Sequence, residues 1–226
     1  MALNFSTTKQ ASQKAGIKVL VYGRAGMGKT TLCGTAPRPL IISAESGLMP
    51  LRHLDIPVVE VKSIVDVWEA YKWIASGADK GHVETICLDS LSEIAEVVLA
   101  AEKRKSKDPR QAYGGLIDEM IGLVKGFRDL PGKNVVVTAK EVAEINPVTG
   151  VTRYGPKAPG KTVGPELPYL FDEVFYAGVG KDQTGATFHY LRTKPDAQVD
   201  AKDRSGVLDE IEYPDLGNIF NKIKGA

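Results

Sequence analysis

The sequence has few cysteines and almost no net charge. Cys33 and Cys87 are its two cysteines, and both lie in apolar segments. Their spacing fits neither a disulfide framework nor a metal site, so we expect buried thiols in a reducing compartment. The formal net charge of +1 excludes a chain-wide attraction to nucleic acid or to a membrane. A site for a polyanion must therefore be a local patch.

The sequence also lacks an internal repeat, a low-complexity tract and a hydrophobic run of membrane-spanning length. Its first residues, MALNFSTTKQASQK, are polar and contain no apolar stretch typical of a signal peptide. We therefore expect a cytoplasmic protein without a membrane partner. The 226 residues, 43% hydrophobic and 25% charged, suit one substantial α/β domain over residues 17–226, preceded by a partly ordered arm at 1–16. We expect Phe5, in this arm, to pack on its own domain, with docking on a neighbouring subunit as the alternative.

The most informative stretch is residues 19–32, VLVYGRAGMGKTTL. An apolar run leads into Gly23-x-x-x-x-Gly28-Lys29-Thr30, which matches the phosphate-binding loop pattern in full. In such loops the glycines turn backbone N–H groups toward phosphate oxygens, the lysine binds the β- and γ-phosphates, and the hydroxyl is a ligand of Mg²⁺. We therefore predict a site for ATP and Mg²⁺ formed by Gly23, Arg24, Ala25, Gly26, Met27, Gly28, Lys29, Thr30 and Thr31.

Two acidic residues follow predicted strands. Residues 40–44 (LIISA) indicate a buried strand followed by Glu45, and residues 83–88 (VETICL) a strand followed by Asp89. Ligands lie at the carboxyl ends of parallel strands in α/β proteins, so both residues should face the nucleotide. We expect Asp89 to hold Mg²⁺ together with Thr30, although an aspartate at this place is also a common helix cap.

The remaining pattern predicts an α/β fold with a mostly parallel twisted sheet, helices on both faces and an antiparallel edge hairpin. Helices are expected at residues 30–35, 91–104, 112–130 and 216–223, and between Ser63 and Gly77. In the last of these, Trp68 and Tyr71 should pack in the core. Further strands are expected at 58–61 and 134–138. The Gly/Pro-rich residues 142–168 predict a hairpin followed by a long mobile loop, and 172–193 the edge hairpin.

The order and spacing of the phosphate loop, Ala44-Glu45 and Asp89-Ser90 resemble the RecA-like P-loop ATPases. More narrowly, residues 108–114 (DPRQAYG), 137–141 (VTAKE) and 201–204 (AKDR) resemble the phage-encoded RecA-like ATPases that assist single-strand annealing recombination. The resemblance covers residues 17–206. It implies a RecA-like core in which Glu45 activates the attacking water and Asp89 is the magnesium aspartate. Few residues precede the first core strand, so we expect a ring or short oligomer and doubt a filament of the RecA kind.

The resemblance also implies partners. These are single-stranded DNA, further copies of the chain, and a single-strand annealing or single-strand-binding protein, in the host cytoplasm if the chain is phage-encoded. Phosphates of the DNA would meet loop cations, and Tyr113 or Tyr154 would offer a stacking face. The alternative for each of these residues is that it is an ordinary solvated residue of the surface. The cations are Arg110, Arg153, Lys157 and Lys161.

Other cations are candidates for the active site itself. Lys140, just past a core strand, is a candidate γ-phosphate sensor or else a solvated lysine. Cations that complete a neighbour's site in trans are expected near the edge hairpin, where alternation would place Arg192 and Lys194 on one strand face. The alternative is a set of edge charges that discourage aggregation. The full set is Arg192, Lys194, Lys202 and Arg204.

Two other functions remain open. A P-loop phosphotransferase acting on a small molecule would explain the phosphate loop equally well, but it needs an arginine-bearing lid and a closed acceptor pocket. A binding module switched by ATP with negligible turnover needs no water-activating residue, and the presence of Glu45 argues against it.

Overall fold

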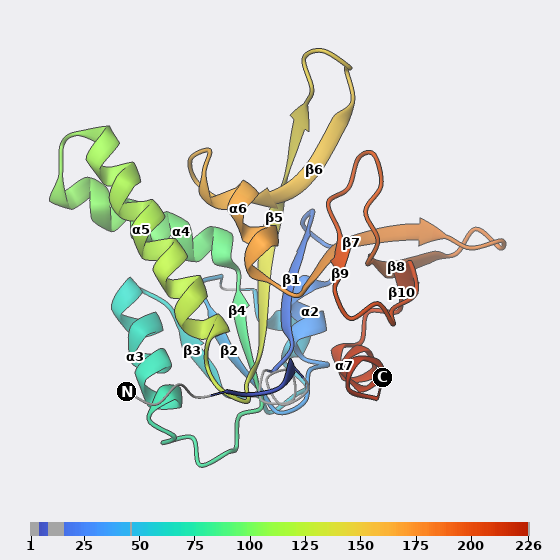
Figure 1. The fold of residues 1–226 in the computed structure, drawn as a ribbon, viewed down its shortest axis with the longest axis horizontal. Coiled ribbons are helices and arrows are strands. Elements are labelled where there is room, and N and C mark those ends of the chain that lie inside the picture. The colour runs from blue at the N-terminus through green and yellow to red at the C-terminus, as the bar shows by residue number, and fades with distance from the viewer. Residues whose placement is uncertain (1–4, 9–15, 46, 226) are drawn as a thin grey trace.

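The computed structural model describes residues 5–8, 16–45 and 47–225. The strands in these residues are β1 (Lys18–Gly23), β2 (Pro39–Ser43), β3 (Val58–Glu60), β4 (Thr85–Asp89), β5 (Asn134–Ile145), β6 (Thr152–Lys157), β7 (Glu173–Lys181), β8 (Thr187–Arg192), β9 (Lys202–Asp203) and β10 (Ile211–Glu212). They form one sheet in the order β10-β8-β7-β1-β5-β4-β2-β3, with β6 added to β5 and β9 to β7 (Figure 1).

The central strands are parallel, as is β3 at one edge, and the strands added at the other edge and along β5 and β7 are antiparallel. β1 lies between β5 and β7, and β4 between β2 and β5, all in parallel register. Every residue of β1 and β4 is buried, as a strand covered on both faces requires. β6, β8, β9 and β10 pair antiparallel with their neighbours. The predicted mostly parallel α/β fold with an antiparallel edge hairpin is confirmed.

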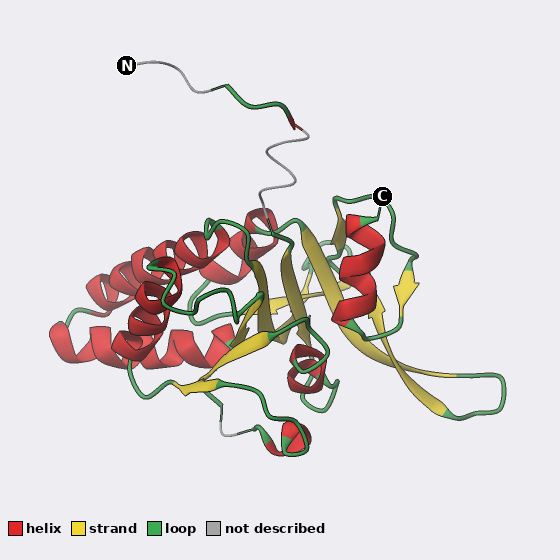
Figure 2. Cartoon of the chain, turned by 90° about the horizontal axis from the view of Figure 1, so that it is seen from below, coloured by secondary structure: helices red, strands yellow, loops and turns green. Residues whose placement is uncertain are grey.

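Helices cover both faces of the sheet (Figures 1 and 2). Alternation along β1 feeds two hydrophobic clusters, because Leu20 and Tyr22 point to one face and Val19 and Val21 to the other. The first face is covered by α3 (Ile64–Ala75), α4 (Leu91–Lys105), α5 (Pro109–Arg128) and α6 (Val163–Leu170). The second is covered by α2 (Lys29–Cys33), the 3₁₀ turn η1 (Met49–Leu51) and α7 (Leu216–Lys224).

Residues 142–168 differ most from expectation. The hairpin is present, since β5 continues past Thr138 to Ile145 and pairs with β6. The prediction of a long mobile loop after this hairpin is wrong, because five residues, 158–162, separate β6 from α6. Burial of Val163 and Leu167 against the sheet outweighs the poor helix propensity of Gly164 and Pro168. The predicted helix at 30–35 is also shorter, ending at Cys33.

Phe5 is 88% exposed, so the expectation that it packs on its own domain is wrong. Its segment points away from the sheet and its helices (Figure 2), and no apolar surface of the domain covers the ring. Docking on a neighbouring subunit stays a prediction. The rest of the expected arm, residues 1–4 and 9–15, lies outside the described residues.

Two predictions about the interior are confirmed. Cys33 and Cys87 are free and buried. Trp68 and Tyr71 pack edge to face, with ring centroids 5.4 Å apart, and Tyr71 makes the same type of contact with the buried Phe127. Within the described part of the chain, no helix combines the length and apolar character needed to cross a membrane.

Candidate functional site

The phosphate-binding loop connects β1 to α2. Gly26 and Gly28 have φ angles of +81° and +76°, a region that glycine adopts without Cβ strain. A Cβ on Gly23 would lie 2.5 Å from the carbonyl oxygen of Ala177 on the neighbouring strand, so this position also needs glycine. The Lys29 ammonium donates to the carbonyl oxygens of Gly23 at 2.8 Å and Arg24 at 2.9 Å. The loop therefore holds its lysine charge at its own centre.

Asp89 ends β4 and is 2% exposed. One carboxylate oxygen accepts a hydrogen bond from the Thr30 hydroxyl at 2.7 Å, and the other from Thr138 at 2.5 Å. Burial raises the pKa of Asp89, against the lowering effect of the two hydroxyls and of Lys29. Thr30 and Asp89 lie side by side and present oxygen ligands of the kind that Mg²⁺ prefers. The donor set therefore fits the expected ion.

Glu45 lies at the same edge of the sheet, because β2 pairs with β4 in a register that places Ser43 beside Asp89. Its side-chain oxygen accepts a hydrogen bond from the Ser90 hydroxyl at 2.6 Å, and its carbonyl oxygen one from Ser43 at 2.6 Å. Burial lowers the pKa of Lys29, and the carboxylates of Glu45 and Asp89 oppose this shift. The fold thus brings the predicted lysine, glutamate and aspartate together.

Lys140 lies beside the phosphate loop, since β5 is parallel to β1 and places Lys140 next to Gly23. Its ammonium forms an ion pair with Glu93 of α4, and this bond raises the pKa of Lys140. Its backbone N–H donates to the Ser92 hydroxyl at 2.9 Å. The candidate sensor is therefore close to the loop but bound to a carboxylate.

Three residues near the site escaped the sequence analysis. Thr138 precedes Lys140 by two positions on the same strand, and this spacing places both side chains on one face. The sequence could therefore have indicated Thr138. Glu141 has one buried carboxylate oxygen without a hydrogen-bond partner. His189 of β8 lies beside the loop, with its Nδ1 3.9 Å from the place of a Cβ on Gly28. No local pattern marks His189, because its position depends on how the β7–β8 hairpin lies against β1.

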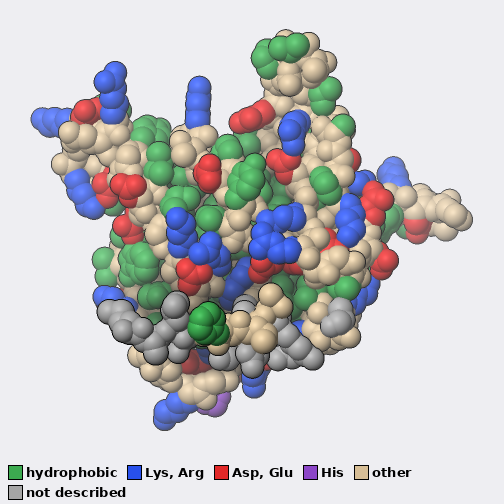
Figure 3. Space-filling model, viewed as in Figure 1, with side chains coloured by type: hydrophobic (Ala, Val, Ile, Leu, Met, Phe, Trp, Pro, Cys, Tyr) green, Lys and Arg blue, Asp and Glu red, His purple; other side chains and the backbone are tan. Residues whose placement is uncertain are grey.

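The predicted DNA ligands fall into two groups. Arg110 and Tyr113 lie in the first turns of α5, and Gly160 lies against the Tyr113 ring, where a Cβ would be 3.3 Å away. Lys161 follows Gly160, and Lys157 ends β6. Arg110 and Tyr113 therefore lie beside the α4–α5 tip, over which Lys and Arg side chains gather (Figure 3, upper left).

The second group lines a cleft of about 600 Å³ between the β5–β6 hairpin, α6 and residues 200–202. Arg153 is in this lining and forms an ion pair with Asp200. Tyr154 also lines the cleft, and its ring tilts against Tyr176 at a centroid distance of 6.5 Å. The structure therefore separates Arg153 and Tyr154 from the first group.

The four candidate trans cations all have partners within this chain. Arg192 binds Glu210 at 2.7 Å and Asp196 at 3.4 Å. The remaining contacts are Arg204 with Asp172 at 2.7 Å, Lys194 with Asp203 at 2.5 Å, and Lys202 with the carbonyl oxygen of Pro168 at 2.6 Å.

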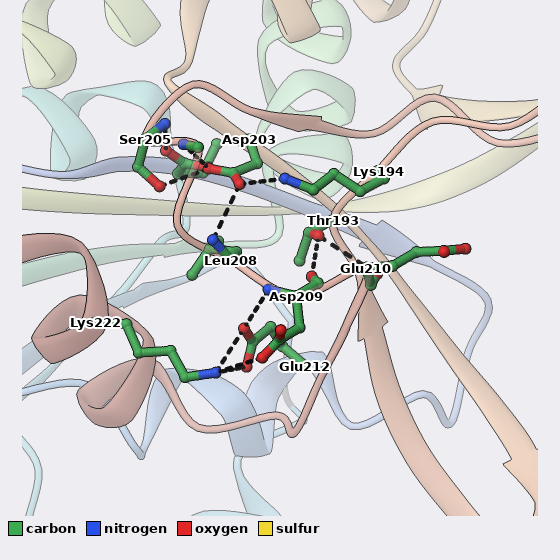
Figure 4. Close-up of polar contacts among 11 residues, drawn as sticks. Thr193, Lys194, Asp203, Ser205, Leu208, Asp209, Glu210, Glu212 and Lys222 are labelled. Atoms are coloured by element: carbon green, nitrogen blue, oxygen red, sulfur yellow. Dashed lines mark hydrogen bonds and ion pairs between the residues drawn. The ribbon is translucent and has the colours of Figure 1, made fainter. Parts of the chain in front are cut away.

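The expectation that Arg192 and Lys194 share a strand face is wrong. β8 ends at Arg192, and Thr193 donates its hydroxyl to the carbonyl oxygen of Asp209 at 2.5 Å (Figure 4). Lys194 is thereby directed to Asp203. Burial would raise the pKa of Asp203, but hydrogen bonds from Lys194, Ser205 and backbone N–H groups lower it to about 2.

Comparison with known protein families agrees with this site. The AAA domain family matches residues 15–205, a range that contains the phosphate loop, Glu45, Asp89 and Lys140. Among solved structures, the chain is similar to a KaiC-like protein from the hyperthermophilic archaeon Pyrococcus horikoshii OT3, with 16% identity, 79% of each chain covered and a TM-score of 0.46. A search of curated proteins found no match. On the family match, the chain belongs to the AAA domain family of P-loop ATPases.

Proposed function

We propose that this chain is a Mg²⁺-dependent ATPase that acts on single-stranded DNA in phage-type recombination or annealing. One observation supports hydrolysis above all: Glu45 is held by Ser90 at 2.6 Å, at the sheet edge where Asp89 binds Thr30 at 2.7 Å. A chain that only bound ATP would have no use for a second oriented carboxylate beside the phosphate loop.

The hydrolysis step follows from these positions. Lys29 exchanges the carbonyl oxygens of Gly23 and Arg24 for the β- and γ-phosphates. Glu45 orients a water in line with the γ-phosphate and takes its proton as the water oxygen bonds to the γ-phosphorus, while the bond between the γ-phosphorus and the bridging oxygen of ADP breaks. Thr30 and Asp89 would hold Mg²⁺, which neutralises charge on the phosphates when bound. Lys140 would add a second positive charge after exchanging Glu93 for phosphate.

The proposed DNA surface uses the first group of cations. Among the described residues, no ion pair involves Arg110, Lys157 or Lys161, whereas Arg153 is paired with Asp200. A cation without an acidic partner can bind phosphate without first breaking an ion pair. Tyr113, 36% exposed and next to Gly160, offers a stacking face on the same surface. Arg153 and Tyr154 would contribute from the cleft.

A homo-oligomer completes the proposal. The trans cations Arg192, Lys194, Lys202 and Arg204 would serve a neighbouring active site, and each must exchange its partner within the chain to do so. An annealing or single-strand-binding protein remains the proposed protein partner.

The test is ATP hydrolysis with and without single-stranded DNA at two salt concentrations. We expect release of inorganic phosphate, stimulation by DNA, and weaker stimulation at high salt. Transfer of the γ-phosphate to a nucleoside or nucleotide would instead identify a phosphotransferase. Nucleotide binding without turnover under every condition would identify an ATP-switched binding module.

A further inference from the structure

One buried hydroxyl connects helix α4 to the β5–β6 hairpin. Ser92 is 4% exposed, donates to the carbonyl oxygen of Lys157 at 2.6 Å, and accepts from the backbone N–H of Lys140 at 2.9 Å. Lys140 and Lys157 are cross-strand partners in the hairpin. Ser92 therefore binds both strands of the hairpin at the point where it leaves the sheet.

The same turn of α4 contacts the nucleotide edge of the sheet. Ser90, two positions earlier, donates to the Glu45 carboxylate, and Asp89 accepts from Thr30. Glu93, the next residue after Ser92, pairs with the Lys140 ammonium. Residues 89–93 thus contact α2 and the end of β2 on one side and the root of the hairpin on the other.

We propose that Ser92 is a positioning residue that transmits the state of the nucleotide site to the β5–β6 hairpin. Thr30 and Lys29 must change hydrogen-bond partners when phosphates enter the loop, and Thr30 is bonded directly to Asp89 at the start of this turn. A displacement of the turn moves both hairpin strands together, because the Ser92 hydroxyl accepts from the N–H of Lys140 on β5 and donates to the carbonyl oxygen of Lys157 on β6. Without the hydroxyl, the start of α4 still contacts the hairpin through the Glu93–Lys140 ion pair, which Lys140 gives up when it binds phosphate, so the hairpin no longer follows the turn.

If Ser92 has only a structural role, a different result is expected. Its removal would leave the Lys140 N–H and the Lys157 carbonyl unpaired and would lower stability, but the hairpin would still respond to nucleotide. The distinguishing measurement is therefore the response of the hairpin to nucleotide, since physical coupling has to be demonstrated and not inferred from a chain of contacts.

The experiment is hydrogen–deuterium exchange on the full chain, with and without Mg²⁺ and a slowly hydrolysed ATP analogue. In the wild type, we expect nucleotide to slow exchange in residues 23–31 and to change it about fivefold or more in residues 141–157, as for a coupling of ordinary size. Ser92→Ala should keep the first response and lose the second. Ser92→Cys, which replaces the hydroxyl with a larger and weakly donating thiol, serves if the alanine variant does not fold.

Thr85→Val is the matched control. Thr85 is fully buried and its hydroxyl donates to the carbonyl oxygen of Pro37 at 2.8 Å, at the opposite end of β4. The valine is nearly isosteric, so this variant also loses a buried hydroxyl but should keep both responses.

Two outcomes would overturn the proposal: a hairpin that responds equally in the wild type and in the Ser92 variant, or one that does not respond in the wild type although residues 23–31 do. The inference rests on the nucleotide-binding part of the proposed function and needs no DNA. Absence of DNA binding would refute the proposed DNA role and leave this result intact, whereas no response at residues 23–31 would refute both.

Discussion

The Ser90 hydroxyl donates to the Glu45 carboxylate across 2.6 Å, which holds the proposed general base in one orientation. Ser90→Ala should therefore lower kcat about 10- to 100-fold through poorer alignment, with little effect on the affinity for MgATP. Glu45→Gln, which is nearly isosteric, should lower kcat about 100-fold or more by removing the base. Steady-state hydrolysis and equilibrium binding of ATP measure the two effects separately.

Lys29→Ala is the companion variant for this comparison. It removes the main positive charge of the loop and should lose binding, not only turnover. If Glu45→Gln hydrolyses ATP at the wild-type rate, Glu45 is an ordinary residue at the end of a strand and the hydrolytic assignment fails.

His189 should contact bound nucleotide, because its ring lies beside Gly28 at the entry to α2. The chain has three histidines, so His53 and His82 are controls in the same molecule. We expect the analogue of ATP to protect His189 from diethylpyrocarbonate, with His53 and His82 modified at unchanged rates. Mass spectrometry of each histidine peptide measures this protection. Equal modification of His189 with and without saturating nucleotide would show that its ring faces solvent in the complex.

The placement of Lys29, Glu45 and Asp89 at one edge of the sheet could be predicted because its determinants are local. The pattern around Lys29 is contiguous, and Glu45 and Asp89 each follow a short apolar strand whose carboxyl end faces the ligand in a parallel sheet. Neither inference needs the strand order. Helix α6 could not be predicted in this way, because Gly164 and Pro168 disfavour a helix locally and only the burial of Val163 and Leu167 compensates.

The other errors also concern non-local contacts. The direction of the Lys194 side chain is set by its ion pair with Asp203, nine positions further along the chain. Asp203 is held in turn by the N–H of Gly206, in a turn that the periodicity of the sequence does not predict. Phe5 has an apolar side chain, which normally indicates burial, but its segment leads away from the domain. His189 depends on the packing of one hairpin beside the phosphate loop.

The salt dependence of DNA binding should report on Arg110, Lys157 and Lys161. Replacing all three with alanine should weaken binding of single-stranded DNA and flatten the slope of log K against log salt by about 2 units, at about 0.7 per phosphate contact. ATP affinity should not change. Fluorescence anisotropy titrations at several salt concentrations give the slope.

A triple variant of equal charge is the control for this experiment. Arg38, Lys72 and Lys80 are exposed, and Arg38 and Lys80 precede β2 and β4, at the amino end of the sheet. Replacing them should leave the slope unchanged. If both triple variants flatten the slope equally, the effect reflects net charge, and the DNA site lies elsewhere.

Glu173 should make the fold less stable as the pH rises from about 4.5 to about 7. Burial raises its pKa from 4.5 to about 7; Asp203 and Asp172 also raise it, and the Ser205 N–H opposes them. Because the folded pKa is above the unfolded value, the stabilising contribution is complete below about pH 4.5 and is lost as pH rises through about 7. Glu173→Gln should remove roughly 1–2 kcal/mol of this pH dependence. Urea unfolding at pH 5 and pH 8 measures it, and identical pH profiles for the two proteins would contradict the assignment.

Arg192 provides the test of action between subunits. In the isolated chain its guanidinium is bound to Glu210 at 2.7 Å, so in an oligomer it must exchange this carboxylate for the phosphates of a neighbour. Arg192→Ala protein should therefore bind ATP normally and hydrolyse it slowly. Mixing it with Glu45→Gln protein should restore turnover, since some hybrid interfaces then join an intact Glu45 to an intact Arg192. Light scattering or native mass spectrometry establishes that the two variants co-assemble. If they do and no mixing ratio restores hydrolysis, Arg192 acts within its own chain, and its ion pair with Glu210 serves to hold the edge of the sheet.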